Sequence, residues 1–482
     1  MRKILVLIGI LIVFFTGFIL VRTLIFTKSI PSTKALSIPV LSDSSIKHLS
    51  QAIQIKTISN ANPDSIDVTE FLKFQSFLDT SYPLINHVLD KTIINDYSCI
   101  YRWKGKNSSL NPFLFLAHLD IVPVENSSLT LWNVAPFGGT IKDNAVWGRG
   151  AIDDKGSLIA IMEATEHLLH QQYQPERDIY LCFGHDEELG GEKGAKEIVK
   201  WFEQKNIHPA LVMDEGGIIT KDNFKELNRP IALLGVTEKG HVSYKLSVEV
   251  RGGHSSMPEK ETAIDILSKA LVKIREKQMP VHITLPTNIM LEKIGPGLGF
   301  ATRMALANRW LFEGMLASTF EKKNTTNASI HTTIVPTIIS SGIKENVIPS
   351  VAEATVNSRI MPGETSVDVY EFIKKQINDT RVKITKLPFS SEPGKLTPMD
   401  GEAYKLEEST VYKLLDDVVV TPFLMIGATD GRYYNRISDA VIRFIPAIDP
   451  HGFHGIDERM TFKDFGRMIF FYELMMKGGN KL

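Results

Sequence analysis

The chain has 482 residues, which is more than one compact hydrophobic core accommodates and favours two domains. Hydrophobic residues make up 43% and charged residues 23%, and the formal net charge of -1 excludes both the basic field of a nucleic-acid-binding protein and the acidic composition of a disordered one. The two cysteines, Cys99 and Cys182, are too few for a disulfide framework or a thiolate metal site.

The N-terminus carries an uncharged apolar run over residues 4–21, which follows Arg2 and Lys3. As a helix, this run is about long enough to span ~30 Å of hydrocarbon. A cleaved signal peptide usually has a shorter apolar core and a small-residue cleavage site, and no clear site of that kind follows the run. We therefore predict that residues 1–28 are a signal anchor with the folded part extracytoplasmic or lumenal. The alternative is secretion after signal cleavage.

From about residue 110, apolar strand signals alternate with amphipathic helix signals. Continuous apolar runs, as expected for strands covered on both faces, occupy residues 112–117, 179–183 and 210–213. Helical patterns occupy residues 156–171 and 194–206. This alternation predicts an α/β fold with a largely parallel sheet and helices on both sides.

The pattern changes near residue 240, where residues 241–250 alternate strictly, as a half-exposed strand does. The elements that follow are a helix at 261–277, strands at 330–339 and 351–360, a helix at 366–377 and a strand at 381–387. The order β-α-β-β-α-β suggests a ferredoxin-like α+β domain. Residues 285–328 interrupt it, and we assign their apolar helix candidate, residues 307–320, to core or dimer packing.

After about residue 390 the α/β pattern returns, with a strand at 440–447 and a final helix at 462–477. We therefore predict that residues 40–238 and 389–482 form two parts of one larger domain. Residues 239–388 would form a smaller domain inserted between them.

Each strand of the larger domain leads into histidines or carboxylates. These residues are His118 and Asp120, Asp153, Glu187 and Glu188, Asp214, and His454. In an open parallel sheet, sites form at the carboxyl ends of the strands, so these side chains should meet at one edge. Crowded carboxylates need cations, because desolvated like charges repel strongly. Mixed His and Asp/Glu ligation without cysteine predicts two divalent metals, zinc first, with cobalt or manganese as substitutes.

The spacing of these residues indicates their roles. His118 is a ligand, and the Asp120 carboxylate would accept a hydrogen bond from its other ring nitrogen. Glu188 would bind metal, while Glu187 would stay beside a metal-bound water as general base. Asp186 would hold the turn instead of a metal. For the last ligand, "HGFHG" offers His451 and His454, and we prefer His454.

Seven motifs occur in order over about 350 residues: "AHLDIVPV", "WGRGAIDDKGS", "GHDEELGG", "VMDEGG", "RGGHSSMP", "ENVIPSVAEATVNSRIMPG" and "HGIDERM". Together they resemble the co-catalytic di-zinc family of aminoacylases, glutamate carboxypeptidase and succinyl-diaminopimelate desuccinylase. Within it, they are most similar to the branch of carboxypeptidase S and the N-fatty-acyl-amino-acid synthase/hydrolase. The resemblance implies a zinc-peptidase catalytic domain with an inserted lid or dimerisation domain.

The resemblance also implies a role for each motif residue. His118 and Asp214 would hold one zinc, Glu188 and His454 the other, and Asp153, joined to Asp154 by a cis peptide, would bridge both. Glu187 would be the general base. His254 would stabilise the oxyanion, supplied by the partner subunit in dimeric relatives. Three residues would contact the substrate carboxylate: Asn346, Arg359 and Arg432.

The expected function is hydrolysis of the amide of an N-acyl amino acid or of the last peptide bond of a short peptide. A metal-bound hydroxide would attack, with Glu187 as the base. The alternatives are N-acyl amino acid synthesis at the same site in reverse, and a catalytically silent metal- or peptide-binding ectodomain. The expected partners are the small substrate, a membrane through the N-terminal helix, and a second subunit through the inserted domain, with no nucleic acid.

Overall fold

The computed structural model describes residues 2–27, 33–60, 66–222 and 225–479. The chain divides into two compact units. The first, the sheet unit, consists of Ser29–Val236, Leu396–Phe423 and Thr429–Leu482. The second, the inserted unit, consists of Met1–Lys28, Thr237–Lys395 and Leu424–Ala428.

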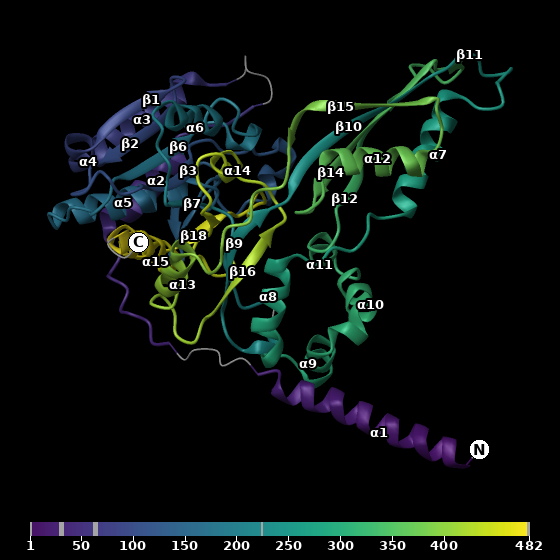
Figure 1. Cartoon of the computed structure of the whole chain (residues 1–482). Coiled ribbons are helices and arrows are strands. Elements are labelled where there is room, and N and C mark those ends of the chain that lie inside the picture. Colours follow the sequence, from purple (N-terminus) through teal and green to yellow (C-terminus); the bar gives the residue numbers. More distant parts are fainter. Residues whose placement is uncertain (1, 28–32, 61–65, 223–224, 480–482) are drawn as a thin grey trace. The chain divides into compact units, whose positions relative to one another are not determined.

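The sheet unit is built on one mixed sheet with the strand order β1-β2-β6-β3-β7-β17-β9-β16, and β8 pairs with β9 (Figure 1). Its strands are β1 (Asp90–Ile94), β2 (Ser98–Trp103), β3 (Phe113–His118), β6 (Ile179–Gly184), β7 (Leu211–Asp214), β8 (Ile219–Thr220), β9 (Ile231–Glu238), β16 (Val419–Met425) and β17 (Val441–Arg443). The central strands β6, β3, β7 and β17 run parallel, whereas β1 and β2 pair antiparallel. The predicted parallel sheet is confirmed in its centre.

Two apolar cores cover the two faces of this sheet, because alternate residues of each strand point to opposite sides. Along β6, Leu181 and Phe183 belong to one core, and Tyr180 and Cys182 to the other. The helices of the sheet unit are α2 (Asp43–Gln54), α3 (Val68–Ser81), α4 (Pro83–Val88), α5 (Lys155–His170), α6 (Ala195–Gln204), α13 (Glu402–Val411), α14 (Gly431–Tyr434) and α15 (Phe462–Gly478). Residues of α2, α5 and α15 line the first core, and those of α6 and α14 line the second.

The inserted unit contains a four-stranded antiparallel sheet with the order β12-β14-β10-β15. Its strands are β10 (Gly240–Glu249), β12 (Thr333–Ser341), β14 (Val351–Ile360) and β15 (Val382–Ser391), and a two-stranded ribbon joins β11 (Gly253–His254) to β13 (Val347–Ile348). Helices α7 (Ala263–Glu276) and α12 (Ser366–Ile377) share one core with this sheet. Their order along the chain, β10-α7-β12-β14-α12-β15, is the predicted ferredoxin-like one.

Residues 285–328 of the inserted unit form a set of short helices. These are α8 (Leu285–Ile294), α9 (Phe300–Ala307), α10 (Arg309–Phe320) and α11 (Asn324–Ala328). Of the core or dimer packing expected for residues 307–320, core packing is wrong for α10, which buries only Leu316, and dimer packing stays a prediction. The same unit contains α1 (Arg2–Ile25), which is long and apolar enough to cross a membrane, although a signal sequence meets the same criterion.

Candidate metal centre

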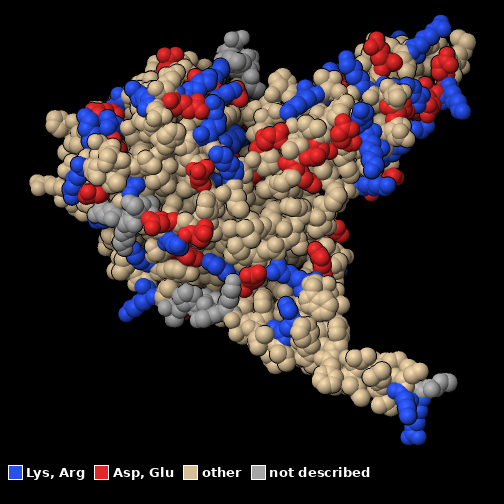
Figure 2. Space-filling view, viewed as in Figure 1, with Lys and Arg blue, Asp and Glu red and all other residues tan. Residues whose placement is uncertain are grey.

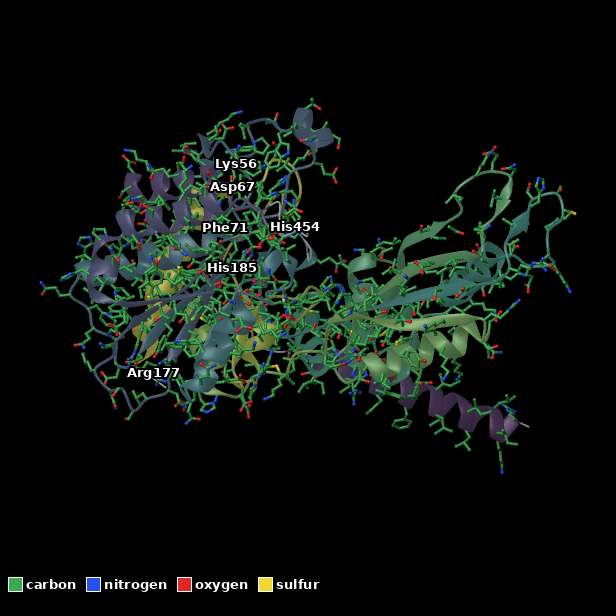
Figure 3. All side chains as sticks on the ribbon, turned by 90° about the horizontal axis from the view of Figure 1, so that it is seen from above. Lys56, Asp67, Phe71, Arg177, His185 and His454 are labelled. Atoms are coloured by element: carbon green, nitrogen blue, oxygen red, sulfur yellow. The ribbon has the colours of Figure 1, made fainter. Side chains whose placement is uncertain are left out.

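The predicted ligands lie where strands of the sheet unit end. β3 ends at His118, and its parallel neighbour β6 ends at Gly184, directly before the acidic turn. Asp153 lies just before α5, and His454 comes from the loop before the last helix. A small sheet, β18-β5-β4, brings this last loop close, because β18 (Arg459–Thr461) pairs with β5 (Ala145–Trp147), which also pairs with β4 (Thr140–Lys142). Figure 3 labels His454 and His185 on the sheet unit.

The first cluster forms around His118. Its Nε2 lies 2.9 Å from Asp153 Oδ1 and 3.3 Å from Glu215 Oε1, and all three side chains are buried. On the other side of the ring, Nδ1 lies 2.9 Å from the backbone oxygen of Asp120. That contact fixes the ring so that Nε2 faces the carboxylates.

The second cluster forms around His454. Its Nε2 lies 2.7 Å from Asp153 Oδ2 and 3.3 Å from Glu188 Oε1. The two oxygens of Asp153 therefore belong to different clusters, Oδ1 to that of His118 and Oδ2 to that of His454. This is the arrangement of a carboxylate shared by two cations.

Asp153 is held in place by Glu458 and Arg149, which the sequence analysis did not name as site residues. Glu458 Oε1 accepts hydrogen bonds from the backbone N–H groups of Ile152 at 2.8 Å and Asp153 at 3.2 Å, and Glu458 Oε2 accepts one from Arg149 Nη1 at 2.6 Å. The peptide bond between Asp153 and Asp154 is cis, as the resemblance implies. The signal for Glu458 was its place in "HGIDERM".

The acidic turn (Glu187–Leu189) is shaped by two aspartates. Asp120 accepts hydrogen bonds from the backbone N–H of Glu187 at 3.1 Å and of Glu188 at 3.2 Å. The expected contact from His118 to the Asp120 carboxylate is longer, at 3.3 Å, than its contact to the Asp120 backbone oxygen. Asp186 accepts hydrogen bonds from the backbone N–H of Lys193 and Gly194, so it holds the turn as predicted.

Asp214 is held by two backbone hydrogen bonds, and its role as a ligand stays a prediction. Its Oδ2 accepts a 2.6 Å hydrogen bond from the backbone N–H of Gly431, and its Oδ1 accepts one from the N–H of Glu215 at 3.0 Å. Its neighbour Glu215 instead faces His118. Asp214 therefore holds the start of α14, and Glu215 is a further candidate ligand beside it in the His118 cluster.

The carboxylates of both clusters favour a positive charge beside them. Hydrogen bonds to Asp153 and Glu188 raise the pKa of His454 to about 10. Burial opposes the charged form of His118, yet hydrogen bonds to Asp120, Asp153 and Glu215 raise the pKa of that ring well above its usual value. Both rings thus favour a positive charge next to the carboxylates, as expected where divalent cations balance the site.

Glu187 differs from its neighbour Glu188. It has no described contact with His118 or His454, and its Oε1 lies 4.0 Å from Nη2 of Arg432, which follows the start of α14. Burial and the nearby Asp430 raise the pKa of the Glu187 carboxyl well above its usual value. A carboxyl group with a raised pKa beside a metal cluster is suited to proton transfer.

The donor set fits divalent metals. Two histidine nitrogens and three carboxylates converge as two clusters that share Asp153. Among the described residues, buried Glu215 Oε2 has no hydrogen-bond partner, and buried Glu188 Oε1 has only the 3.3 Å approach of His454 Nε2. Such oxygens are costly to bury unless a cation or a proton compensates them.

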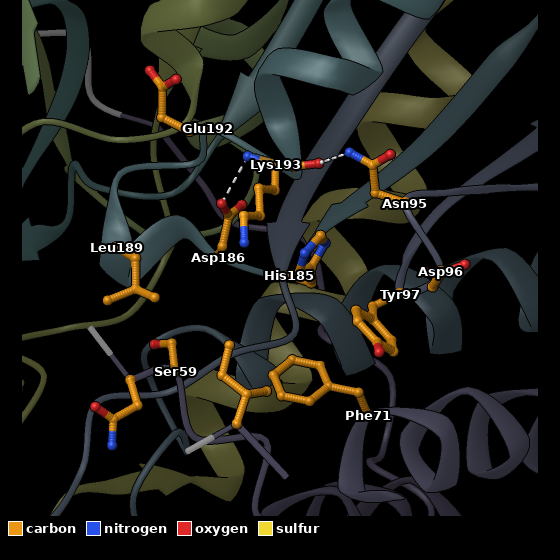
Figure 4. Close-up of a pocket in the computed structure, with 12 residues that line it drawn as sticks. Ser59, Phe71, Asn95, Asp96, Tyr97, His185, Asp186, Leu189, Glu192 and Lys193 are labelled. Carbon is orange, nitrogen blue, oxygen red and sulfur yellow. Dashed lines mark hydrogen bonds between the residues drawn. The ribbon is translucent and has the colours of Figure 1, made fainter. Parts of the chain in front are cut away.

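A pocket of about 460 Å³ borders the acidic turn (Figure 4). His185 and Asp186 line it, together with Phe71, Tyr97 and Leu189. His185 Nδ1 lies 2.7 Å from Ser98 Oγ, and its ring packs edge-on against Tyr97, so His185 is structural here. The described residues that line the pocket include none of the candidate ligands.

Three predicted residues belong to the inserted unit. His254 on β11 pairs with Val347 of β13, and Ser255 next to it donates a 3.2 Å backbone hydrogen bond to the Asn346 carbonyl. His254 and Asn346 are therefore neighbours on an exposed ribbon. Arg359 lies near the far end of β14, opposite His241 of β10.

Comparisons with known proteins agree with this geometry. Residues 114–478 match the model of peptidase family M20/M25/M40. "Probable carboxypeptidase S-like 2" of Dictyostelium discoideum is 39% identical over 98% of this chain and 93% of its own length. Human "N-fatty-acyl-amino acid synthase/hydrolase PM20D1" is 35% identical over 89% of this chain and 86% of its own length.

Among solved structures, an M20 family metallo-carboxypeptidase from Sulfolobus solfataricus superposes with a TM-score of 0.68 at 17% identity, covering 92% of this chain and all of its own. The fold is therefore shared at low identity. The family match and the relatives together show that this chain belongs to peptidase family M20/M25/M40 and is a metallohydrolase of its carboxypeptidase and N-acyl amino acid hydrolase type.

Proposed function

We propose that the chain uses two zinc ions to hydrolyse the amide bond of N-acyl amino acids or the C-terminal peptide bond of short peptides. The observation that carries this proposal is that the two carboxylate oxygens of Asp153 contact different histidines, Oδ1 His118 and Oδ2 His454. The named activities of the similar chains, a carboxypeptidase and an N-fatty-acyl-amino acid hydrolase, support the substrate class.

The proposed ligands follow the two clusters. His118 and Asp153, with the predicted Asp214 or its neighbour Glu215, would hold one cation, and Asp153, Glu188 and His454 the other. Histidine and carboxylate donors without cysteine suit zinc, and cobalt or manganese would substitute. Bound zinc would polarise the scissile carbonyl and lower the pKa of water from about 15.7 toward about 7.

Glu187 is the proposed general base. It would accept the proton of the attacking water and return it to the leaving amine, a role that suits its raised pKa. Its backbone N–H is held by Asp120, which fixes the turn next to the ligand Glu188. Arg432, 4.0 Å away, would orient Glu187 and contact the substrate carboxylate, since a guanidinium binds a carboxylate in a fork.

We further propose that Asn346 and Arg359 contact the substrate carboxylate and that His254 stabilises the oxyanion. The proximity of His254 and Asn346 on one ribbon supports a shared role. We also propose that α1 anchors the protein in a membrane, with the sheet unit outside the cytoplasm. Its 24 residues, exposed almost throughout, support this role.

Metal removal tests the proposal. The full chain, purified in detergent, should hydrolyse an N-acyl amino acid or a blocked dipeptide and contain two zinc ions per chain by mass spectrometry. Dialysis against a chelator should abolish hydrolysis, and zinc, cobalt or manganese should restore it. Hydrolysis that survives complete metal removal would refute the proposed mechanism.

Synthesis at the same site is the second candidate, because the PM20D1 relatives are named synthase/hydrolase. Incubation with a free fatty acid and an amino acid should then yield the N-acyl amino acid, and Glu187→Gln should abolish both directions. Loss of hydrolysis alone in that variant would separate the two activities.

A further inference from the structure

The inserted unit carries an apolar surface that adjoins α1. From Ile294 to Phe320 the chain has three charged residues, Arg303, Arg309 and Glu313. Several large apolar side chains of this stretch are exposed: Phe300, Trp310, Leu311 and Met315. We call these four side chains the apolar patch. Figure 2 shows a largely uncharged surface over α1 and the adjoining α9 and α10.

The patch begins where α10 contacts the last turns of α1. Trp310 stacks edge-on against Phe15 with ring centroids 6.0 Å apart, and it lies 6.4 Å from the ring of Phe18. Arg22 donates two hydrogen bonds to the Ala307 carbonyl. These residues of α1 share one face, because they follow the helical period.

Polar contacts fix this junction. Asn308 Nδ2 lies 3.2 Å from Thr23 Oγ1 and 3.3 Å from the Ile19 carbonyl, and both Asn308 and Thr23 are fully buried. Phe26 packs so closely on Gly295 that a Cβ at that position would lie 2.7 Å from its ring. The start of α10 is therefore docked on α1 at a defined height.

The position at which α10 meets α1 sets how far along α1 the side chain of Trp310 lies. Phe18 and Phe15 precede Arg22 by four and seven residues, which is about 6–10 Å along a helix rising about 1.5 Å per residue. Both phenylalanines belong to the uncharged run of α1. If α1 spans a bilayer, a side chain that contacts them lies in that bilayer as well. Helices that lie in a membrane interface bury their apolar face to about 5–10 Å, and tryptophan is enriched there.

We infer that the apolar patch is immersed in the same lipid bilayer as α1, so that the inserted unit contacts the membrane through α9 and α10 as well as through its anchor. This inference rests on the proposed anchoring role of α1. The lipid bilayer would cover the patch. Arg22, Arg303 and Arg309 flank the patch, as expected at the level of lipid phosphates.

Tryptophan fluorescence tests the inference, because the other four tryptophans belong to the sheet unit. Trp103, Trp132 and Trp147 are buried and Trp201 is half-buried, whereas Trp310 is 55% exposed. The full chain is reconstituted in phosphatidylcholine vesicles brominated near the headgroup end of the acyl chains. Wild-type emission should be quenched, Trp310→Phe should lose most of that quenching, and the control Trp201→Phe should keep it.

A second probe covers the case that Trp310→Phe misfolds. Both native cysteines are buried, so a cysteine introduced at Met315 accepts an environment-sensitive dye selectively. Val367 on α12 of the same unit is the matched control, with 65% exposure against 53% for Met315. In vesicles the dye at position 315 should be blue-shifted and protected from aqueous reductant, and the dye at 367 should not.

The outcomes separate the inference from the anchor. Release of the protein by an alkaline carbonate wash refutes the anchor, and the inference with it. Retention of the protein, with equal quenching of wild type and Trp310→Phe and an unprotected dye at 315, refutes the inference alone. Protection that depends on protein concentration but not on lipid would assign the patch to a second copy of the chain and also refute the inference.

Discussion

At the scale of single residues, two adjacent glutamates of one turn are separated by their surroundings. Glu188 faces His454 and Asp153, whereas Glu187 faces Arg432. Because the peptide N–H groups of both residues are held by Asp120, neither side chain can take the other's place without breaking the turn. Different chemistry is therefore expected from neighbouring identical residues.

Glu187→Gln should keep both metals and the fold but lower kcat about 10²–10⁴-fold, because an amide cannot accept the proton. Metal content by mass spectrometry and kcat with an N-acyl amino acid are the measurements. Glu197→Gln, on the nearby α6, is the matched control and should hydrolyse like wild type. Near-normal turnover of Glu187→Gln with two metals bound would remove Glu187 from the mechanism.

Glu215→Ala should lower the metal content toward one ion per chain, because it removes a donor next to His118. Asp214→Ala should instead retain the metals and lower the urea midpoint, because it removes the 2.6 Å acceptor of the buried Gly431 N–H and leaves only the longer 3.3 Å contact to Thr429 Oγ1. Paired metal analysis and urea unfolding distinguish the two residues. Loss of metal from Asp214→Ala but not from Glu215→Ala would support the ligand role predicted for Asp214.

The sequence predicted most of this centre, because parallel strands carry their terminal residues to one edge. His118, Asp153, Glu188 and His454 converge as expected. The sequence analysis named Asp214 and gave no signal for Glu215, because the direction of the Glu215 side chain depends on how the chain turns after β7. The backbone N–H of Gly431, more than 200 residues later in the chain, donates a hydrogen bond to the Asp214 carboxylate, and no local sequence pattern predicts that contact.

At the scale of elements, long periodic segments were predictable and short irregular ones were not. The apolar periodicity of α5, α7, α12 and α15 identified these helices within a few residues of their ends. The helix expected over residues 307–320 is shorter in the structure. α9 ends at Ala307 and α10 begins at Arg309, because the backbone of Asn308 between them leaves the helical region. The two-residue strands β11 and β13 leave no periodic signal, because period-2 alternation needs several residues.

Helix α13 carries a buried acid in its apolar face. Glu407 is fully buried, neither of its oxygens has a hydrogen-bond partner among the described residues, and burial raises the pKa of its carboxyl from 4.5 to about 8. Between about pH 5 and 8 the unfolded chain has released this proton while the folded chain keeps it. The free energy of unfolding should therefore fall as the pH rises, by up to about 1.4 kcal/mol per unit.

Glu407→Met should remove that component, because the apolar side chain of similar size has no proton to lose. Urea midpoints of the variant should exceed those of wild type at pH 8 and approach them near pH 5. The exposed acid Glu402 on the same helix gives the control, Glu402→Gln, which should keep the wild-type slope. Parallel slopes for wild type and Glu407→Met would show that Glu407 titrates normally.

At the scale of the whole molecule, the proposed metal ligands and His254 belong to different units. A histidine that meets the developing oxyanion would therefore come from the inserted unit, either of the same chain or of a second chain. In well-studied oxyanion holes, the loss of one donor costs about 2.7–4 kcal/mol in the transition state. His254→Ala should accordingly lower kcat about 10²–10³-fold with metal content unchanged.

Mixing variants decides between the two arrangements. If His254 acts on the partner's site, subunit exchange between inactive His254→Ala and inactive Glu187→Gln should restore part of the activity. One site of the mixed dimer would then have both an intact base and an intact histidine. Hydrolysis is measured after subunit exchange has been verified by differently tagged chains, and an inactive mixture would place His254 on its own chain's site.

The order of strands in the main sheet also bears on how the protein is made. β17 pairs in parallel with β7, yet the chain between them runs from Asp214 to Val441 and includes the whole inserted sheet. At translation rates of about 5–20 residues per second, β17 leaves the ribosome roughly 10–45 s after β7. For that interval β7 presents an open, apolar edge of the kind that recruits other chains. During this interval, binding of molecular chaperones to the nascent chain therefore competes with its aggregation.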